Sequence, residues 1–114
     1  MSTFIAGHYA NQYDGTVLNG GTISNEIQLG NDVHFGLYGV FSVPGTLTFE
    51  VRPDTTFSKA TLKDGANAAI GVTVNGTTAI SGEVLKPLAP YNYVTVSVTP
   101  AQTSGAAFKF ITKA

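Results

Sequence analysis

The 114-residue chain contains no cysteine and no tryptophan, and its charged residues are few. Without cysteine, the chain can form neither a disulfide framework nor a thiolate metal site. Aspartate, glutamate, lysine and arginine make up 11% of the residues, under half of the roughly 25% usual for soluble domains. A weakly charged, threonine-rich surface is compatible with broad contact to protein, because few charges would lose water on assembly. It is equally compatible with a β-rich domain that carries threonine in place of lysine and glutamate.

Basic residues occur singly along the chain, and the formal net charge is −1. A nucleic-acid binder needs a concentrated basic face to displace counterions from phosphates, so we expect no nucleic-acid partner. The first residues, MSTFIAGHYANQYDG, lack the basic start and apolar core of a signal peptide. No apolar run approaches the roughly 20 residues of a membrane helix, so we expect no membrane partner.

Short runs of valine, isoleucine, threonine and aromatic residues alternate with turns rich in the 13 glycines and 5 prolines. This pattern predicts an all-β chain of one domain. About eight short antiparallel strands favour a single β-sandwich of jelly-roll or Ig-like type, with a small closed barrel as the alternative. We assign residues 15–114 to the sandwich and residues 1–14 to an N-terminal arm or first strand.

Apolar residues at every second position locate the strands. The expected strands cover residues 22–29, 33–41, 46–52, 59–63, 68–74, 77–85, 91–98 and 108–112. The residues expected to face the core are Ile23, Ile27, Leu29, Val33, Phe35, Leu37, Phe41, Leu47, Phe49, Val51, Val94, Val96, Val98, Phe108 and Phe110. The face of Phe108 and Phe110 could instead meet a partner. The opposite side of the strand at 91–98 is uncharged, so it could lie against protein or water.

Turns are expected where glycine follows aspartate, asparagine or proline, because glycine and asparagine tolerate positive φ. These dipeptides are Asp14-Gly15, Asn19-Gly20, Pro44-Gly45, Asp64-Gly65 and Asn75-Gly76. The last of them predicts a hairpin between two strands. Residues 86–90, with two prolines, predict a stiff loop. Residues 60–69 are the one place where a helical turn is compatible with the pattern.

No residues form a convincing catalytic or metal-binding motif. Asp32 and His34 would share one face of a strand, and Ser42 could complete a triad, but no G-x-S-x-G nucleophile turn occurs. His8 and His34 are too far apart in sequence to indicate a metal site by their spacing. Three of the seven carboxylates lie in turn contexts, where aspartate caps backbone groups. We expect no enzyme activity, cofactor or metal.

Aromatic and apolar residues outside the expected core are the candidates for protein contact. Tyr91 and Tyr93 lie opposite the valine face of their strand, where they could form an outer surface or pack under a loop. The first residues contain Phe4, Ile5, Tyr9 and Tyr13. They form either a first strand or frayed end, or an arm that lies across a neighbouring subunit.

Several segments together form a characteristic succession of predicted strands and turns. They are SNEIQLGN (24–31), FGLYGVFSVPGTLTFEV (35–51), PDTTFSKATLKDGAN (53–67), LAPYNYVTVSV (88–98) and FKFITK (108–113). From Thr22 to Lys113 the chain resembles small β-sandwich virion proteins of tailed bacteriophages, many of which are capsid decoration (cement) proteins. The resemblance rests on this succession of strands and turns, and it implies no catalytic residues. At residues 98–100 the chain differs from the Ser-Gly turn that the family pattern would have.

The resemblance implies a non-enzymatic virion component on the outer surface of the capsid. Its partner would be the major capsid protein, and the chain would form a homo-oligomer, with a trimer favoured. A domain of the phage tail or a fibre is an alternative that the sequence leaves open. A carbohydrate-binding module is another, although the absence of tryptophan weakens it.

Overall fold

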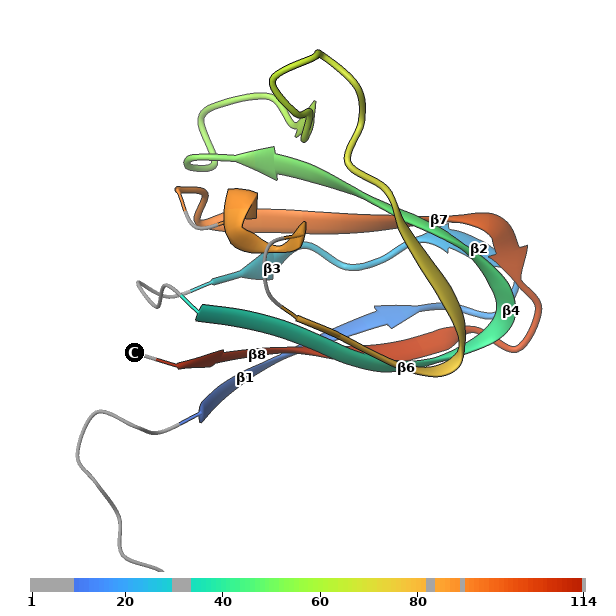
Figure 1. Ribbon diagram of the computed structural model, residues 1–114. Coiled ribbons are helices and arrows are strands. Elements are labelled where there is room, and N and C mark those ends of the chain that lie inside the picture. Colours follow the sequence, from blue (N-terminus) through green and yellow to red (C-terminus); the bar gives the residue numbers. More distant parts are fainter. Residues whose placement is uncertain (1–9, 30–33, 82–83, 89, 114) are drawn as a thin grey trace, which may run out of the picture.

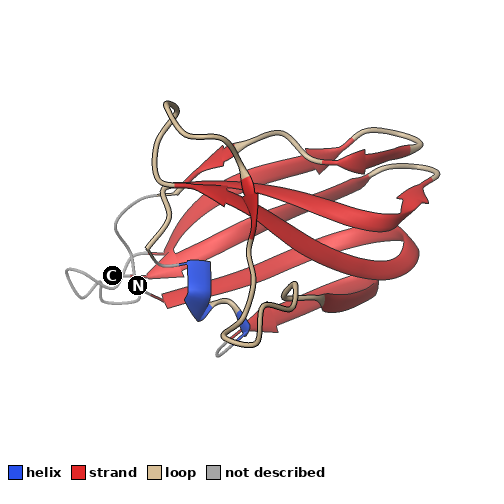
Figure 2. Cartoon of the chain, turned by 90° about the horizontal axis from the view of Figure 1, so that it is seen from above, coloured by secondary structure: helices blue, strands red, loops and turns tan. Residues whose placement is uncertain are grey.

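A computed structural model describes residues 10–29, 34–81, 84–88 and 90–113 of the chain. Eight strands in this part of the chain are linked by antiparallel ladders, and they make up most of it (Figure 2). The strands are β1 (Ala10–Val17), β2 (Gly21–Ile23), β3 (Ile27–Gln28), β4 (His34–Arg52), β5 (Ala60–Thr61), β6 (Val72–Ser81), β7 (Tyr93–Gln102) and β8 (Ala106–Lys113). A short 3-10 turn, η2 (Lys86–Leu88), lies before β7.

The 19-residue strand β4 belongs to two layers. Its first half, 34–41, pairs with β8, and its second half, 46–52, pairs with β7. One layer, sheet I, therefore contains β1, β8, the first half of β4 and the end of β6. The other, sheet II, contains β2, β3, β7, the second half of β4, β5 and the start of β6. Figure 1 shows β4 and β6 turning from one layer into the other at the right of the view. The expected all-β sandwich is confirmed.

The turn expected at Pro44-Gly45 is wrong, because both residues lie inside β4. The strand bends here, and its pairing with β6 shifts register between Phe41 and Gly45. Residues 42–44 lie between these pairs, opposite Asn75 alone on β6, so β4 carries two more residues here than its partner strand. The buried Gln102 side chain bonds to both the N–H and the C=O of Val43. These bonds supply the partners that the bent strand loses, so the chain continues instead of reversing.

The hairpin expected at Asn75-Gly76 is also wrong, because β6 runs through both residues. Gly76 does adopt a positive φ of 61°, as the dipeptide predicts. The Thr78 hydroxyl accepts a hydrogen bond from the Asn75 N–H at 3.1 Å. The unusual backbone angle therefore lies where β6 passes the bend of β4, and it does not reverse the chain.

The turn expected at Asp14-Gly15 lies in the middle of β1. Gly15 is opposite Phe108 on β8, and a Cβ atom at Gly15 would lie 2.2 Å from the Phe108 ring. The glycine is needed for this close approach of a ring to the backbone, and not for a turn. The turns expected at Asn19-Gly20 and Asp64-Gly65 are confirmed.

Three other expectations change in detail. The strand expected at 22–29 is divided into β2 and β3, and Ile23 is 58% exposed instead of facing the core. The helical turn that 60–69 allowed is absent from this described segment, where the Asp64 carboxylate accepts hydrogen bonds from the N–H groups of Ala66 and Ala68. The stiff loop at 86–90 contains η2, whose Leu88 is buried.

The core between the two sheets contains most of the apolar residues that the alternation predicts, together with others that it did not single out, among them Val17, Leu62, Leu85 and Leu88. Leu47, Phe49 and Val51 are buried from β4. The valine face of β7 is buried beside them in sheet II, and the two phenylalanines of β8 are buried across from them in sheet I. The Phe49 and Phe110 rings lie 6.4 Å apart, which joins sheet II to sheet I. Ile27, Leu29, Leu37 and Phe41 are also buried as expected, while Val33 and the Phe35 side chain lie outside the described part.

A candidate protein-interaction face

The structure does not bring together the six residues predicted for a protein interface. Phe4, Ile5 and Tyr9 lie outside the described residues. Tyr13 is half-buried and packs against the core, on the same side of β1 as the buried Val17.

Tyr91 is half-buried and likewise packs partly against the core. Tyr93 is half-buried below the Arg52 guanidinium, whose Cζ lies 5.8 Å from the ring centre. Thr95, on the same side of β7 as Tyr93, is only 1% exposed, and its Oγ1 has no hydrogen-bond partner in the described part of the chain. The uncharged side of this strand is therefore largely covered by the protein itself, and a contact role for the three tyrosines stays a prediction.

The outer surface of sheet I offers a broader exposed area. Two rows of side chains cross it, set by the antiparallel registers of β1, β8, β4 and β6. We call these eight residues the outer face: Thr16, Ala107, Val40 and Thr77 in one row, and Asp14, Lys109, Tyr38 and Ala79 in the other. Tyr38 and Val40 are 49% and 54% exposed, high values for large apolar side chains.

Sequence reasoning missed the outer face because, for the strand at 33–41, it considered only the side expected to face the core. A signal was present: the segment FGLYGVF carries apolar residues at both even and odd positions. Such a strand is either buried on both sides or exposes apolar area on one of them.

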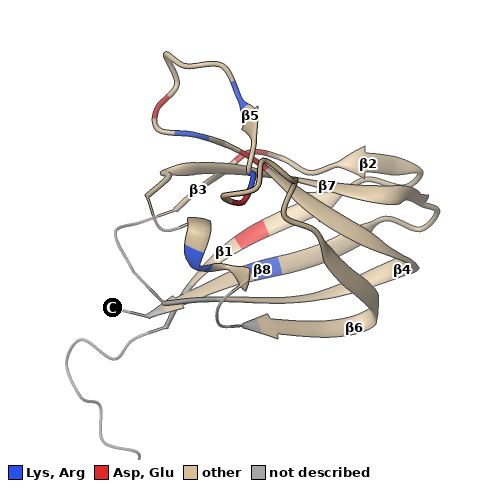
Figure 3. Ribbon diagram, turned by 45° about the horizontal axis from the view of Figure 1, so that its top comes forward, with Lys and Arg blue, Asp and Glu red and all other residues tan. Residues whose placement is uncertain are grey.

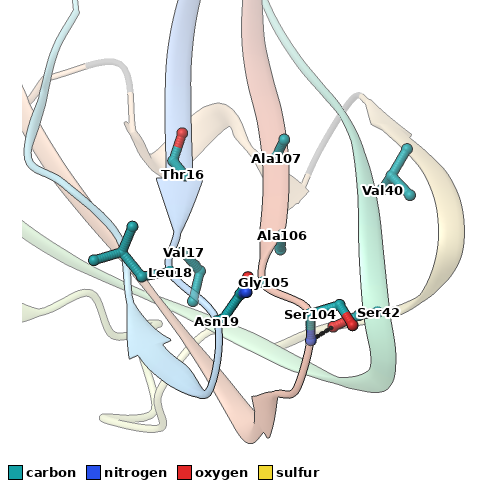
Figure 4. Close-up of a pocket in the computed structure, with 10 residues that line it drawn as sticks. All are labelled: Thr16, Val17, Leu18, Asn19, Val40, Ser42, Ser104, Gly105, Ala106 and Ala107. Carbon is teal, nitrogen blue, oxygen red and sulfur yellow. Dashed lines mark hydrogen bonds between the residues drawn. The ribbon is translucent and has the colours of Figure 1, made fainter.

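Three shallow hollows meet at Thr16, where the outer face reaches the end of the sandwich. The hollow between β1, β8 and β4, shown in Figure 4, has a volume of about 440 Å³. We call it the Thr16 hollow. Leu18, 76% exposed, and Val40 belong to opposite sides of it, and the buried Val17 and Ala106 also line it. No charged side chain is among its lining residues.

The outer face carries a single pair of charges (Figure 3). The Lys109 ammonium lies 3.1 Å from the Asp14 carboxylate, and it also donates a hydrogen bond to the Gln12 side chain at 3.2 Å. Both charges are well exposed and paired on the same surface, so a partner could cover this face without burying an unpaired charge.

A separate cluster lies at the far end of β4. The Arg52 Nε and Nη2 atoms donate to the two oxygens of Glu26 at 2.8 and 2.5 Å, a bidentate pair. The hydrogen bond from Arg52 holds the pKa of Glu26 below its ordinary range, and the same bond raises the pKa of Arg52. Lys59 approaches the Glu26 carboxylate at 4.0 Å. Arg52 has further N–H groups that do not bond to Glu26, and these can bond to the turn that follows β4.

The residues considered for catalysis do not form a site in the described part. Asp32 and the His34 side chain lie outside it, as does His8. The Ser42 hydroxyl accepts a hydrogen bond from the Ser104 N–H at 3.2 Å and lies 3.5 Å from the Gln102 amide oxygen. Among the described residues, no three of histidine, cysteine, aspartate or glutamate gather as metal ligands would. None of the described helical segments has the length and hydropathy of a membrane span.

Comparison with known proteins adds information on the fold. No protein-family model matches the chain, and no curated protein matches it in sequence. Among solved structures, the chain is similar to the SPBc2 prophage-derived protein YomS, with a TM-score of 0.57 and 13% sequence identity. The match covers 99% of this chain and 100% of that one. The chain therefore shares its fold with a prophage-derived protein.

Proposed function

We propose that this chain is a structural protein of a phage virion, of the capsid decoration or cement type. In this role it binds the lattice of the major capsid protein on the outer surface of the capsid and catalyses no reaction. The observation that carries the proposal is the full-length similarity of fold to a prophage-derived protein. The resemblance of residues 22–113 to small virion proteins of tailed phages points to the same class.

The outer face supplies a physical basis for binding a lattice. Its side chains are small or apolar apart from one internal ion pair, so a protein partner would cover it at little electrostatic cost. A capsid repeats the same binding site many times, and a homo-oligomer, with a trimer favoured, would engage several sites at once. The effective concentration of the second contact then makes weak single contacts sufficient. A protein that binds the assembled shell better than free subunits stabilises the shell by linkage.

The test is a count of copies in the particle. Virions of the phage that encodes the chain are purified, and the amount of the chain relative to the major capsid protein is measured by quantitative mass spectrometry. Hundreds of copies per particle are expected for a decoration protein. A handful of copies would move the chain to the tail or a fibre, and its absence from purified virions would overturn the virion role.

A further inference from the structure

The strand β1 lies at the end of the strand order β1-β8-β4-β7-β2. One of its edges pairs with β8 along its full length. At one end of its other edge, an antiparallel bridge joins Val17 to Ser24, in the segment between β2 and β3. An edge strand presents backbone N–H and C=O groups with which a strand of another chain can pair. The way in which this edge is covered therefore affects which chains can add to the sheet.

The side chain of Asn25 bonds to two backbone groups on this edge. Its Oδ1 atom accepts a hydrogen bond from the Thr16 N–H at 2.8 Å, and its Nδ2 atom donates to the Asp14 carbonyl oxygen at 3.4 Å. In a parallel ladder, one residue bonds to the C=O of one residue on the neighbouring strand and to the N–H two positions further on. The Asn25 amide makes the same pair of bonds, so a side chain takes the place of a neighbouring strand.

Sheet II holds Asn25 in this position. The preceding residue, Ser24, is buried, and its N–H donates to the Val96 carbonyl oxygen at 2.9 Å. The Ser24 hydroxyl accepts from the Val96 N–H at 3.0 Å and donates to the Asn25 carbonyl oxygen at 2.8 Å. The following residue, Glu26, is bound to Arg52. Because the backbone is fixed on both sides of Asn25, its side chain bonds to β1 with little further loss of backbone entropy.

The surroundings of this edge would favour association if the edge were uncovered. Leu18 and Ile23 are 76% and 58% exposed. They line the same shallow hollow as Thr16 and Asn25. A strand edge with exposed apolar side chains beside it is a site at which chains pair and aggregate.

Asn25 also limits the length of edge that another strand could use. With its two bonds in place, an added strand could pair with residues 10–13 of β1 at most. Without these bonds, the pairing could extend to residue 16. Strands in globular proteins usually have about five or six residues. The length that Asn25 leaves is therefore shorter than a usual strand, and the uncovered length would be longer than one.

We propose that Asn25 blocks the addition of a strand to β1 and so keeps copies of this chain from joining edge to edge. Its amide makes, within one chain, the bonds that an incoming strand would need. The inference goes beyond the proposed function, because an oligomer that forms through any other surface is compatible with it.

The first experiment compares the self-association of the full chain with that of Asn25→Ala by sedimentation velocity over a wide range of concentrations. Asn25→Ala is expected to form larger species than the wild type does, with an association constant at least about tenfold higher, as two added hydrogen bonds would give. The matched control is Gln28→Ala, which removes an exposed amide from β3 and should associate like the wild type. Thermal melting checks that the variants remain folded.

Two further variants test whether any new association uses the edge of β1. Thr16→Pro is added to Asn25→Ala, because proline has no N–H and is tolerated on an edge strand where the N–H faces outward. The Thr16 N–H faces Asn25, so the double variant should keep its ladder with β8 and return to the association of the wild type. Asn25→Asp keeps an oxygen that can accept from the Thr16 N–H, and it should also associate like the wild type.

Amide hydrogen exchange, followed by NMR at low protein concentration, tests the block within one molecule. The Thr16 amide should exchange at least about tenfold faster in Asn25→Ala than in the wild type, because it loses its acceptor. The Leu62 amide, which donates to the Phe49 carbonyl oxygen, should exchange at the same rate in both.

Three results would each overturn the proposal. They are equal association of the wild type and Asn25→Ala, a double variant that associates as strongly as Asn25→Ala, and an unchanged exchange rate of the Thr16 amide. None of them bears on the virion role, which the copy count tests separately.

Discussion

The buried amide of Gln102 is expected to determine the bend of β4, and its replacement by methionine tests this. Gln102 is fully buried. Its side chain accepts a hydrogen bond from the Val43 N–H at 3.0 Å and donates to the carbonyl oxygens of Val43 and Pro100 at 3.0 and 3.1 Å. Methionine has a similar length and fills the same space without these bonds. The change therefore isolates the hydrogen bonds from the packing.

Three hydrogen bonds at about 1 kcal/mol each predict a loss of about 3 kcal/mol in the free energy of unfolding. Val43 is only half-buried, so its freed N–H and C=O groups can regain water and the loss stays near this net value. A domain of this size is stabilised by about 5–15 kcal/mol, so Gln102→Met should remain folded at room temperature. Its melting temperature should fall by about 10 °C.

Urea unfolding followed by circular dichroism measures the difference, and differential scanning calorimetry gives the melting temperature. The matched control is Gln28→Met on β3, where the glutamine is exposed and the expected change is within about 0.5 kcal/mol. If Gln102→Met and Gln28→Met unfolded at the same urea concentration, the buried amide would not be what supports the bend.

Three further predictions concern single side chains. Thr95→Val should stabilise the protein by about 1 kcal/mol in urea unfolding, because it removes a buried hydroxyl for which the described residues offer no partner; a loss of stability would show that the hydroxyl is satisfied. The folded-state pKa of Glu26 lies below its ordinary value of 4.5, so its ion pair adds stability above that pH and loses it as pH falls through the lowered pKa. The stability difference between wild type and Glu26→Gln should therefore shrink from about pH 6 to about pH 3, and a constant difference would contradict the assignment. Gly15→Ala should destabilise the protein by about 1–3 kcal/mol, because its Cβ would meet the Phe108 ring. Gly65→Ala, with open space around it, should be close to neutral by the same melting assay, and equal effects of the two changes would refute the packing argument.

The sequence alone determined the all-β class, the approximate positions of most strands and part of the core. The alternation of apolar and polar residues can be recognised within each strand alone. Burial of the apolar side of each strand between the two sheets stabilises the fold. Leu47, Phe49 and Val51 could be placed for this reason, as could the valines of β7. The prediction of a two-layer all-β fold followed from the same pattern.

Tertiary structure decided whether a turn dipeptide reverses the chain or bends it. Pro44-Gly45 and Asn75-Gly76 both permit a reversal, yet the chain passes through each of them as a strand. The deciding partner of the first is Gln102, 59 residues from Val43 in sequence, which no local pattern reveals. The candidate site depends on tertiary structure in the same way. Thr16, Val40 and Ala107 come from three strands that become neighbours only through the register of sheet I.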